Sequence, residues 1–106
     1  LEGVTQLLLT IRLVQQLFNR NLVIEGVVLT MFDSRTKLSF EVQTDVRNSF
    51  KDRVYKTNIP RNIKLSEAPS CGKSIFEYDT KCEGAKAYAS LAKEIHRNNQ
   101  QKKVVK

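Results

Sequence analysis

The sequence predicts an α/β fold in which a partial parallel sheet is flanked by helices. Two apolar segments that suit β-strands, residues 23–32 and 54–59, alternate along the chain with segments of helical periodicity. The first, VIEGVVLTMF, is nearly continuous and rich in β-branched residues, which is typical of parallel strands covered on both faces. Because two strands make a poor sheet by themselves, we expect the rest of the sheet to lie N-terminal to this chain.

The first element is expected to be a helix within residues 1–19. Its apolar residues recur at helical spacing from Val4 to Phe18. Leu9 and Leu13 lie off this stripe and widen the apolar surface. We therefore expect the helix to be buried on more than one side, or to have an outer face that awaits a partner.

The middle of the chain is expected to contain a second helix between the two strands. Residues 33–35 form a polar stretch that suits a loop after the first strand. Apolar residues then recur every fourth position from Leu38 to Phe50, which indicates a helix. The second strand should stop at Pro60, because proline cannot donate to a central ladder.

After an irregular stretch at residues 60–79, we expect one more helix. Thr80 and Glu83 have the spacing of a capping box, which marks a helix start. The apolar residues that follow keep helical spacing as far as Ile95. From Asn98 the chain becomes polar and basic, and we expect a frayed tail.

The composition bounds the class of protein. At 106 residues and 41% hydrophobic, the chain can build one modest core, and we expect one domain at residues 1–97 and a basic, flexible tail at 98–106. Eighteen Lys and Arg against eleven Asp and Glu give a net charge of +7, which favours polyanionic partners. Cys71 and Cys82 lack the spacing of a zinc site, and free thiols are expected. No apolar run has the length of a membrane span and no signal peptide is recognisable, so we expect an intracellular, soluble protein.

The tripeptide Gly72-Lys73-Ser74 looks like the end of a phosphate-binding loop. The working motif, G-x-x-x-x-G-K-[ST], would need glycine where this chain has Glu67. A carboxylate at that position would repel phosphates, and Pro69 precedes the tripeptide where a strand should lead in. We therefore expect an ordinary turn around Gly72.

Two loops are candidates for a ligand site. In open α/β sheets, ligands bind outside the carboxyl ends of the strands, which here selects residues 30–35 and 60–64. These loops carry four cations and one side-chain amide: Arg35, Lys37, Arg61, Lys64 and Asn62. Such a rim suits a nucleotide or nucleic acid. From the spacing alone, solvated loop charges remain the preferred interpretation.

Three segments resemble a known family. GVVLTMFDSRTKLSFEV, VYKTNIPRNIKLSEAPSCGKSIFEYD and KCEGAKAYASLAKEI are similar to the C-terminal part of the ParA/Soj ATPases that partition chromosomes or plasmids. IPRNIKLSEAPSCGK is the most specific of these strings, and the resemblance runs from about Leu1 to Ile95. It implies the C-terminal portion of a doubly wound P-loop NTPase-like fold, of the deviant class that includes MinD. Ser74 departs from the family, which often has proline there.

The resemblance also implies what this chain contains and lacks. The family's phosphate-binding loop and Mg-binding aspartates precede the part matched here, so we expect a fragment that does not hydrolyse ATP alone. ATP and Mg are cofactors of the parent family, and neither is expected to bind tightly to this chain. Implied partners are non-specific nucleoid DNA, a ParB-like protein and a second copy of the parent, in the cytoplasm at the nucleoid and without a membrane.

Site residues follow from the same resemblance, position by position. Five positions are expected to border the adenine of ATP: Thr30, Met31, Pro60, Arg61 and Asn62. Proline and methionine offer apolar surface to a base, and backbone and amide groups supply contacts to its edge. Arg35 and Lys64 match basic surface positions that grip DNA without regard to sequence, although a lysine lacks the planar fork of an arginine. For Lys64, a solvated surface charge stays an open alternative.

Two other classes of function remain open. A MinD-like ATPase fragment would bind membrane through an amphipathic C-terminal helix, but only Val104 and Val105 are available for this in the tail. A small basic interaction module without nucleotide activity would need a complete core of its own.

Overall fold

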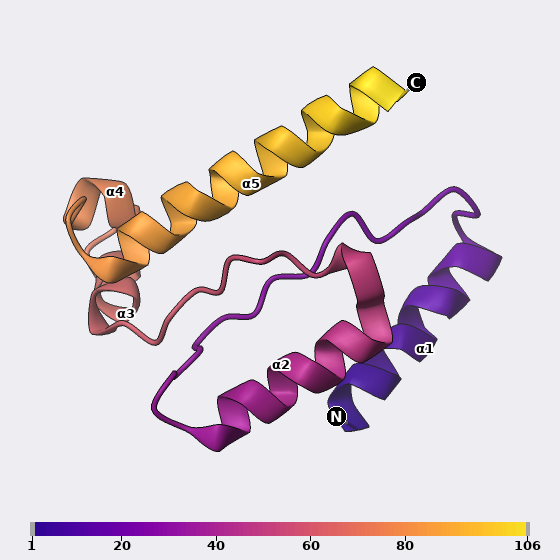
Figure 1. Cartoon of the computed structure of the whole chain (residues 1–106), viewed down its shortest axis with the longest axis horizontal. Helices are drawn as coiled ribbons and strands as arrows, with labels where there is room; N and C mark the ends of the chain where they lie inside the picture. Colours follow the sequence, from indigo (N-terminus) through magenta and orange to yellow (C-terminus); the bar gives the residue numbers. More distant parts are fainter. Residues whose placement is uncertain (1, 106) are drawn as a thin grey trace.

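The structure is a computed structural model that describes the backbone of residues 2–105 and the side chains of residues 2–102. Helices dominate the described range (Figure 1): α1 (Glu2–Leu17), α2 (Lys37–Phe50), the short 3-10 helix η1 (Lys51–Arg53), α3 (Ile63–Ser70), α4 (Ile75–Tyr78) and α5 (Glu83–Val105). The first helix, the central helix and the last helix are confirmed close to their predicted ranges. Thr36 begins α2 as its N-cap, because its side chain accepts a hydrogen bond from the Ser39 N–H.

The two predicted strands are extended but do not form a sheet. Over residues 2–105 no continuous strand is present, and the two segments touch through two isolated parallel bridges, Val27 with Val54 and Phe32 with Pro60. Between these bridges the second segment contains one residue more than the first, which interrupts the ladder. The expected parallel direction is therefore present, whereas the expected partial parallel sheet is not formed by the described residues.

The extended segments run between α5 on one side and α1 and α2 on the other (Figure 1). On the α2 side, the Asn58 side-chain amide donates to Gln43 Oε1 over 2.8 Å. On the α5 side, the Thr57 N–H donates to Glu94 Oε1 over 2.9 Å. These two contacts tie one short stretch of chain to both helical layers.

The core is small. Val46 of α2 is buried, and so are Val54 and Ile59 of the second extended segment. A cluster of Ala68, Ile75 and Ala85 joins the three C-terminal helices. Close packing here depends on a small residue, since a Cβ added at position 84, which is glycine, would lie 2.6 Å from the Leu65 side chain.

The first helix is much less covered than its sequence predicts. None of its described residues is buried, and Leu7, Leu13 and Leu17 keep 55%, 55% and 69% of their surface exposed. Burial on more than one side is therefore wrong for the described residues. The alternative, an apolar face without a partner, is what they show.

Residues 60–79 are not irregular, because side-chain caps start two short helices there. The Asn62 side chain accepts from the Lys64 N–H and begins α3. Ser74 begins α4 with a complete capping box, in which its hydroxyl accepts from the Glu77 N–H and the Glu77 carboxylate accepts from the Ser74 N–H. Helices this short give too little periodicity to be recognised in the sequence.

The tripeptide 72–74 is a turn followed by a helix cap. Gly72 has a φ of 66°, a value that glycine adopts without strain. The Ser74 hydroxyl is engaged in the cap of α4. The predicted turn is confirmed, and the resemblance to a phosphate-binding loop comes from a sequence coincidence.

The predicted capping box at Thr80 and Glu83 is wrong. Helix α5 begins at Glu83, and the Ala85 N–H lies 3.4 Å from Cys82 Sγ. Cys82 therefore takes the N-cap position, two residues later than expected. Both cysteines are free thiols.

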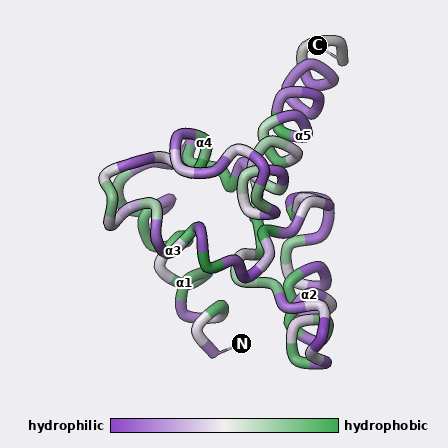
Figure 2. The backbone as a smooth tube through the Cα atoms, turned by 90° about the vertical axis from the view of Figure 1, so that its left-hand side faces the viewer, coloured by the Kyte–Doolittle hydropathy of each residue, from purple (hydrophilic) through white to green (hydrophobic). Residues whose placement is uncertain are grey.

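The C-terminal end differs from the frayed tail that the sequence suggested. Helix α5 continues to Val105, and Figure 2 shows it becoming hydrophilic toward that end. The side chains of residues 98–102 are exposed, and the predicted domain boundary after residue 97 stays a prediction. Within the described range, no helix combines the length and apolar character that crossing a membrane requires.

Candidate functional site

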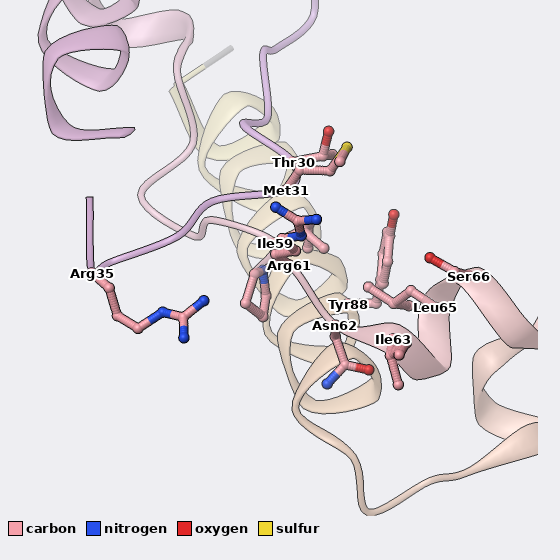
Figure 3. Close-up of a pocket in the computed structure, with 11 residues that line it drawn as sticks. Thr30, Met31, Arg35, Ile59, Arg61, Asn62, Ile63, Leu65, Ser66 and Tyr88 are labelled. Atoms are coloured by element: carbon pink, nitrogen blue, oxygen red, sulfur yellow. The ribbon is translucent and has the colours of Figure 1, made fainter. Parts of the chain in front are cut away.

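A pocket of about 520 Å³ lies where the two extended segments end. Its size falls within the range of about 300–1,000 Å³ that is usual for small-molecule sites. The walls come from both segments, from the start of α3 and from one residue of α5 (Figure 3): Thr30, Met31, Arg35, Ile59, Pro60, Arg61, Asn62, Ile63, Leu65, Ser66 and Tyr88.

The five residues expected to border a base all line this pocket. Thr30 and Met31 come from the end of the first segment, whereas Pro60, Arg61 and Asn62 follow the second. The bridge at Phe32 holds the two ends together, because the Phe32 N–H donates to the Ile59 carbonyl over 3.0 Å and the Phe32 carbonyl accepts from the Arg61 N–H over 3.1 Å. The structure thus brings the predicted residues together, while their contact with adenine stays a prediction.

Met31 adopts an uncommon backbone conformation at the mouth of the pocket. Its φ is 54°, in the left-handed region that residues with a Cβ rarely occupy and that costs roughly 1–2 kcal/mol. The residue keeps 69% of its surface exposed. An apolar side chain is therefore held at the rim with little contact to its own fold, where it is available to a ligand.

Asn62 serves the fold and the pocket with different atoms. Its Oδ1 accepts from the Lys64 N–H over 3.0 Å and caps α3. Among the described residues, no acceptor is paired with its Nδ2 group. This half-buried amide keeps two N–H donors for a ligand, and the capping bond fixes the plane in which they lie.

Several wall residues were not predicted. Ile59, only 1% exposed, forms part of the floor, and Leu65 and Ser66 come from α3. Tyr88 reaches the pocket from α5 (Figure 3). The sequence placed Tyr88 on the apolar face of the last helix, and such a pattern cannot separate a core residue from a pocket wall.

Arg35 lines the same pocket but is paired with Asp33. Its Nε donates to Asp33 Oδ1 and its Nη2 to Asp33 Oδ2, each over 3.0 Å. The side-chain bond to Arg35 is the largest cause that lowers the pKa of Asp33 from 3.8 to about 2, and the charge of Arg61 adds to it. The positive charge expected to meet DNA is therefore partly compensated within the chain.

Lys64 does not line the pocket. Its Nζ lies 5.8 Å from the centre of the Tyr78 ring, a cation–π arrangement. The Tyr78 hydroxyl donates to Glu67 over 3.1 Å, and this bond is the largest cause that raises the pKa of Tyr78. The structure thus places the two residues predicted to bind DNA in different surroundings, one in the pocket and the other over the Tyr78 ring of α4.

Comparison with individual known proteins places the chain in a family, although no family model matches it. The chain is 56% identical over 98 residues to the sporulation initiation inhibitor protein Soj of Bacillus subtilis, covering 92% of this chain and 39% of that protein. It is 54% identical over 95 residues to the chromosome partitioning protein ParA of Caulobacter vibrioides, covering 90% and 36%. The chain is a ParA/Soj-type sequence.

A third relative extends this result. The ParA/Soj-type chain is 53% identical over 95 residues to the chromosome-partitioning ATPase Soj of Treponema pallidum, covering 90% of this chain and 38% of that protein. Across these three relatives the chain spans 36 to 39% of their length. The predicted resemblance to part of a ParA/Soj ATPase is confirmed.

Proposed function

We propose that this chain supplies the base-binding wall of the ATP site in a ParA/Soj-type partitioning ATPase. One observation carries the proposal: residues from the ends of two separate extended segments line a single pocket of suitable size. The relatives' names support the ATPase context, since one of them is a chromosome-partitioning ATPase. The membrane-associated alternative has no comparable support among these relatives.

The chemistry of the pocket fits a purine ring better than a phosphate group. Met31, Pro60 and Leu65 offer apolar surface, and the free amide of Asn62 offers donors to a ring nitrogen. Near the mouth, the guanidinium of Arg35 is engaged by Asp33. ATP, when bound, supplies the phosphoryl group for hydrolysis, and these residues would bind and orient its base.

The phosphate-binding part of such a site has no counterpart in this sequence. No G-x-x-x-x-G-K-[ST] loop occurs in it, and Ser74 of the tripeptide 72–74 is engaged in capping. We therefore infer that these 106 residues alone do not hydrolyse ATP. Release of phosphate from ATP by the purified chain, at the rate of an intact ParA/Soj protein, would contradict this inference.

The wider role follows from the family and is part of the same proposal. The parent protein would bind nucleoid DNA without sequence preference, form a homodimer around ATP, and respond to a ParB-like partner in the cytoplasm. Arg35, Lys64 and the net charge of +7 support the DNA contact. In the parent protein, Mg would be held beside ATP by residues that precede the part matched here.

The base-binding role is tested by titrating the isotope-labelled chain with adenosine and following its NMR signals. We expect a Kd on the order of 1 mM, because the phosphate contacts are missing. Shifts should concentrate on the Met31 methyl group and the Asn62 side-chain amide. Ribose 5-phosphate, which lacks the base, is the matched ligand. If it shifts the same signals, or if adenosine shifts neither, the proposal is wrong.

An Asn62→Asp variant separates binding from folding. The aspartate retains an oxygen that can cap α3 but has no N–H to donate to a base. We expect the helix content to stay unchanged and the adenosine Kd to rise about tenfold, as for loss of one hydrogen bond. Asn48→Asp makes the same chemical change on the exposed face of α2 and should bind adenosine like the unmodified chain.

A further inference from the structure

The second extended segment has an irregularity just before the pocket. The Tyr55 N–H donates to the Val27 carbonyl over 2.9 Å, and the next such bond is from the Ile59 N–H to the Leu29 carbonyl, over 2.8 Å. Residues 55 to 59 therefore face a shorter stretch of the first segment. This is a bulge, and the N–H groups of Lys56 and Thr57 lie outside the ladder.

One carboxylate from α5 accepts hydrogen bonds from both of these N–H groups. Glu94 Oε2 accepts from the Lys56 N–H over 2.7 Å, and Glu94 Oε1 accepts from the Thr57 N–H over 2.9 Å. Hydrogen bonds to a charged acceptor are roughly twice as strong as neutral ones. Two adjacent bonds to one planar group also fix the orientation of the backbone between them.

The surroundings of Glu94 match this role. Burial tends to raise its pKa, but hydrogen bonds from Thr57 and Lys56 and the charge of Arg97 bring the pKa below its ordinary value. Within the described side chains, Glu94 forms no salt bridge with a lysine or arginine. Its hydrogen-bond partners are the two backbone N–H groups and the Thr57 side chain, so its position on α5 is coupled to the path of the chain at residues 56–57.

The clamped stretch leads directly into the pocket. Asn58 follows it, with its side-chain amide bonded to Gln43 of α2, and Ile59 then forms part of the pocket floor. Pro60 and Asn62 come next in the chain. A shift of the bulge by one residue would move each of these groups, because a one-residue slip in an extended chain reverses the direction of its side chains.

We infer that Glu94 is a positioning residue, whose carboxylate holds the bulge at residues 56–57 and thereby sets where Pro60 and Asn62 stand in the pocket. Glu94 does not line the pocket itself. The part of this inference that concerns ligand binding rests on the proposed base-binding function. The part that concerns the backbone stands on the two hydrogen bonds.

The test compares Glu94→Gln with Glu83→Gln in the whole chain. The first variant keeps the length of the side chain but can accept only one of the two N–H groups well. The second makes the same change at an exposed position of α5, where Glu83 pairs with Lys86 at 3.5 Å. For each protein we would measure helix content, amide hydrogen exchange, the signals of Met31 and Asn62, and the adenosine Kd.

For Glu94→Gln we expect exchange at Lys56 or Thr57 to become about tenfold faster or more, which corresponds to loss of a charge-assisted hydrogen bond. The Asn62 side-chain signals should move, and the adenosine Kd should rise about three- to tenfold. Glu83→Gln should change none of these. If exchange is unaltered, or if it accelerates while the Asn62 signals and the Kd stay as they were, the inference is wrong.

Two further outcomes keep the test decisive. If the unmodified chain does not bind adenosine, the base-binding proposal fails, and the exchange rates and Asn62 signals still decide whether Glu94 positions the pocket. If Glu94→Gln does not fold, Glu94→Asp takes its place, because it keeps the charge but is one methylene shorter. Unchanged protection at both Lys56 and Thr57 in that variant would overturn the inference.

Discussion

Asp33 accepts two parallel hydrogen bonds from Arg35 at the edge of the pocket. Because Asp33 can take up a proton, the stability of this pair depends on pH. The pKa of Asp33 is lowered in the folded chain, from 3.8 to about 2. A lowered pKa means that the pair contributes its full stabilisation above about pH 4 and loses it as the pH falls through about 2. At neutral pH the pair is therefore intact.

We predict that the Asp33 carboxyl group titrates near pH 2 in an NMR pH series. In Arg35→Gln its midpoint should move up toward 3.8, because the guanidinium is the main cause of the shift. Lys37→Gln removes a nearby charge that makes no bond to Asp33, and should leave the midpoint in place. A midpoint near 3.8 in the unmodified chain would show that the pair does not form in solution.

Among single residues, the sequence identified those that have a signal in their own neighbourhood. It missed those whose role depends on contacts with distant parts of the chain. Asn62 could be found because it lies in a loop after an apolar segment of an α/β pattern, whereas Met31 was assigned from the resemblance to the ParA/Soj family. Glu94 could not, since one carboxylate among the charges of a long helix has no local signature. It accepts from backbone N–H groups 37 and 38 positions away in the chain.

Among the secondary-structure elements, α4 depends most visibly on its cap. It has four residues, too few to be stable alone, and it contributes the buried Ile75 to the C-terminal cluster. Ser74 and Glu77 satisfy each other's N–H groups at its start. The stability of α4 and of the cluster around Ile75 should therefore depend on the Ser74 hydroxyl.

We predict that Ser74→Ala lowers the free energy of unfolding by about 1 kcal/mol, the usual cost of losing an N-cap. Urea denaturation monitored by circular dichroism measures this change. Ser70→Ala, at an exposed position in the last turn of α3, is the matched control and should have little effect. Equal stability of the Ser74 variant and the unmodified chain would mean that the cap contributes nothing.

Element by element, the sequence predicted what local periodicity determines. Helices α1, α2 and α5 extend over many turns, so their spacing was readable. The extended segments were recognised as such, but the ladder between them depends on pairing across the chain, and a bulge at residues 56–57 interrupts it. Helices α3 and α4 were missed because they are too short for their apolar residues to show a helical spacing after the caps at Asn62 and Ser74.

The molecule as a whole is less compact than its length suggests. Its radius of gyration is 16.0 Å, whereas a compact domain of this size has about 13 Å. Only seven hydrophobic residues in the described range are buried. Composition predicted one modest core, and the fraction of the relatives' length that the chain spans, 36 to 39%, agrees with limited burial.

At this scale we predict weak DNA binding that ignores sequence and depends strongly on salt. If about three to five phosphates are neutralised, the logarithm of the affinity should fall against the logarithm of salt concentration with a slope of about 3 to 4.5. Fluorescence anisotropy with two unrelated duplexes measures both properties. An affinity that stays constant across salt would exclude this mode of binding.

The DNA-binding test compares two variants. One combines Arg35→Gln with Lys64→Gln, and the control is Lys86→Gln. The first pair should weaken binding to both duplexes equally, since phosphate contacts carry no sequence information. Lys86, on α5, is not one of the positions that the resemblance assigns to DNA, so its replacement should change the affinity less. Preferential loss of binding to one duplex would argue against the phosphate contacts.

The uncovered leucines of α1 bear on how this chain behaves in a test tube. Leu7, Leu9, Leu13 and Leu17 keep about half or more of their surface in water, and Phe18 just beyond them keeps 83%. Exposed apolar surface of this kind binds hydrophobic dyes and chromatography resins, and it promotes self-association as the protein concentration rises. Handling the chain dilute, or with a mild detergent, should therefore matter more for its recovery than adding nucleotide.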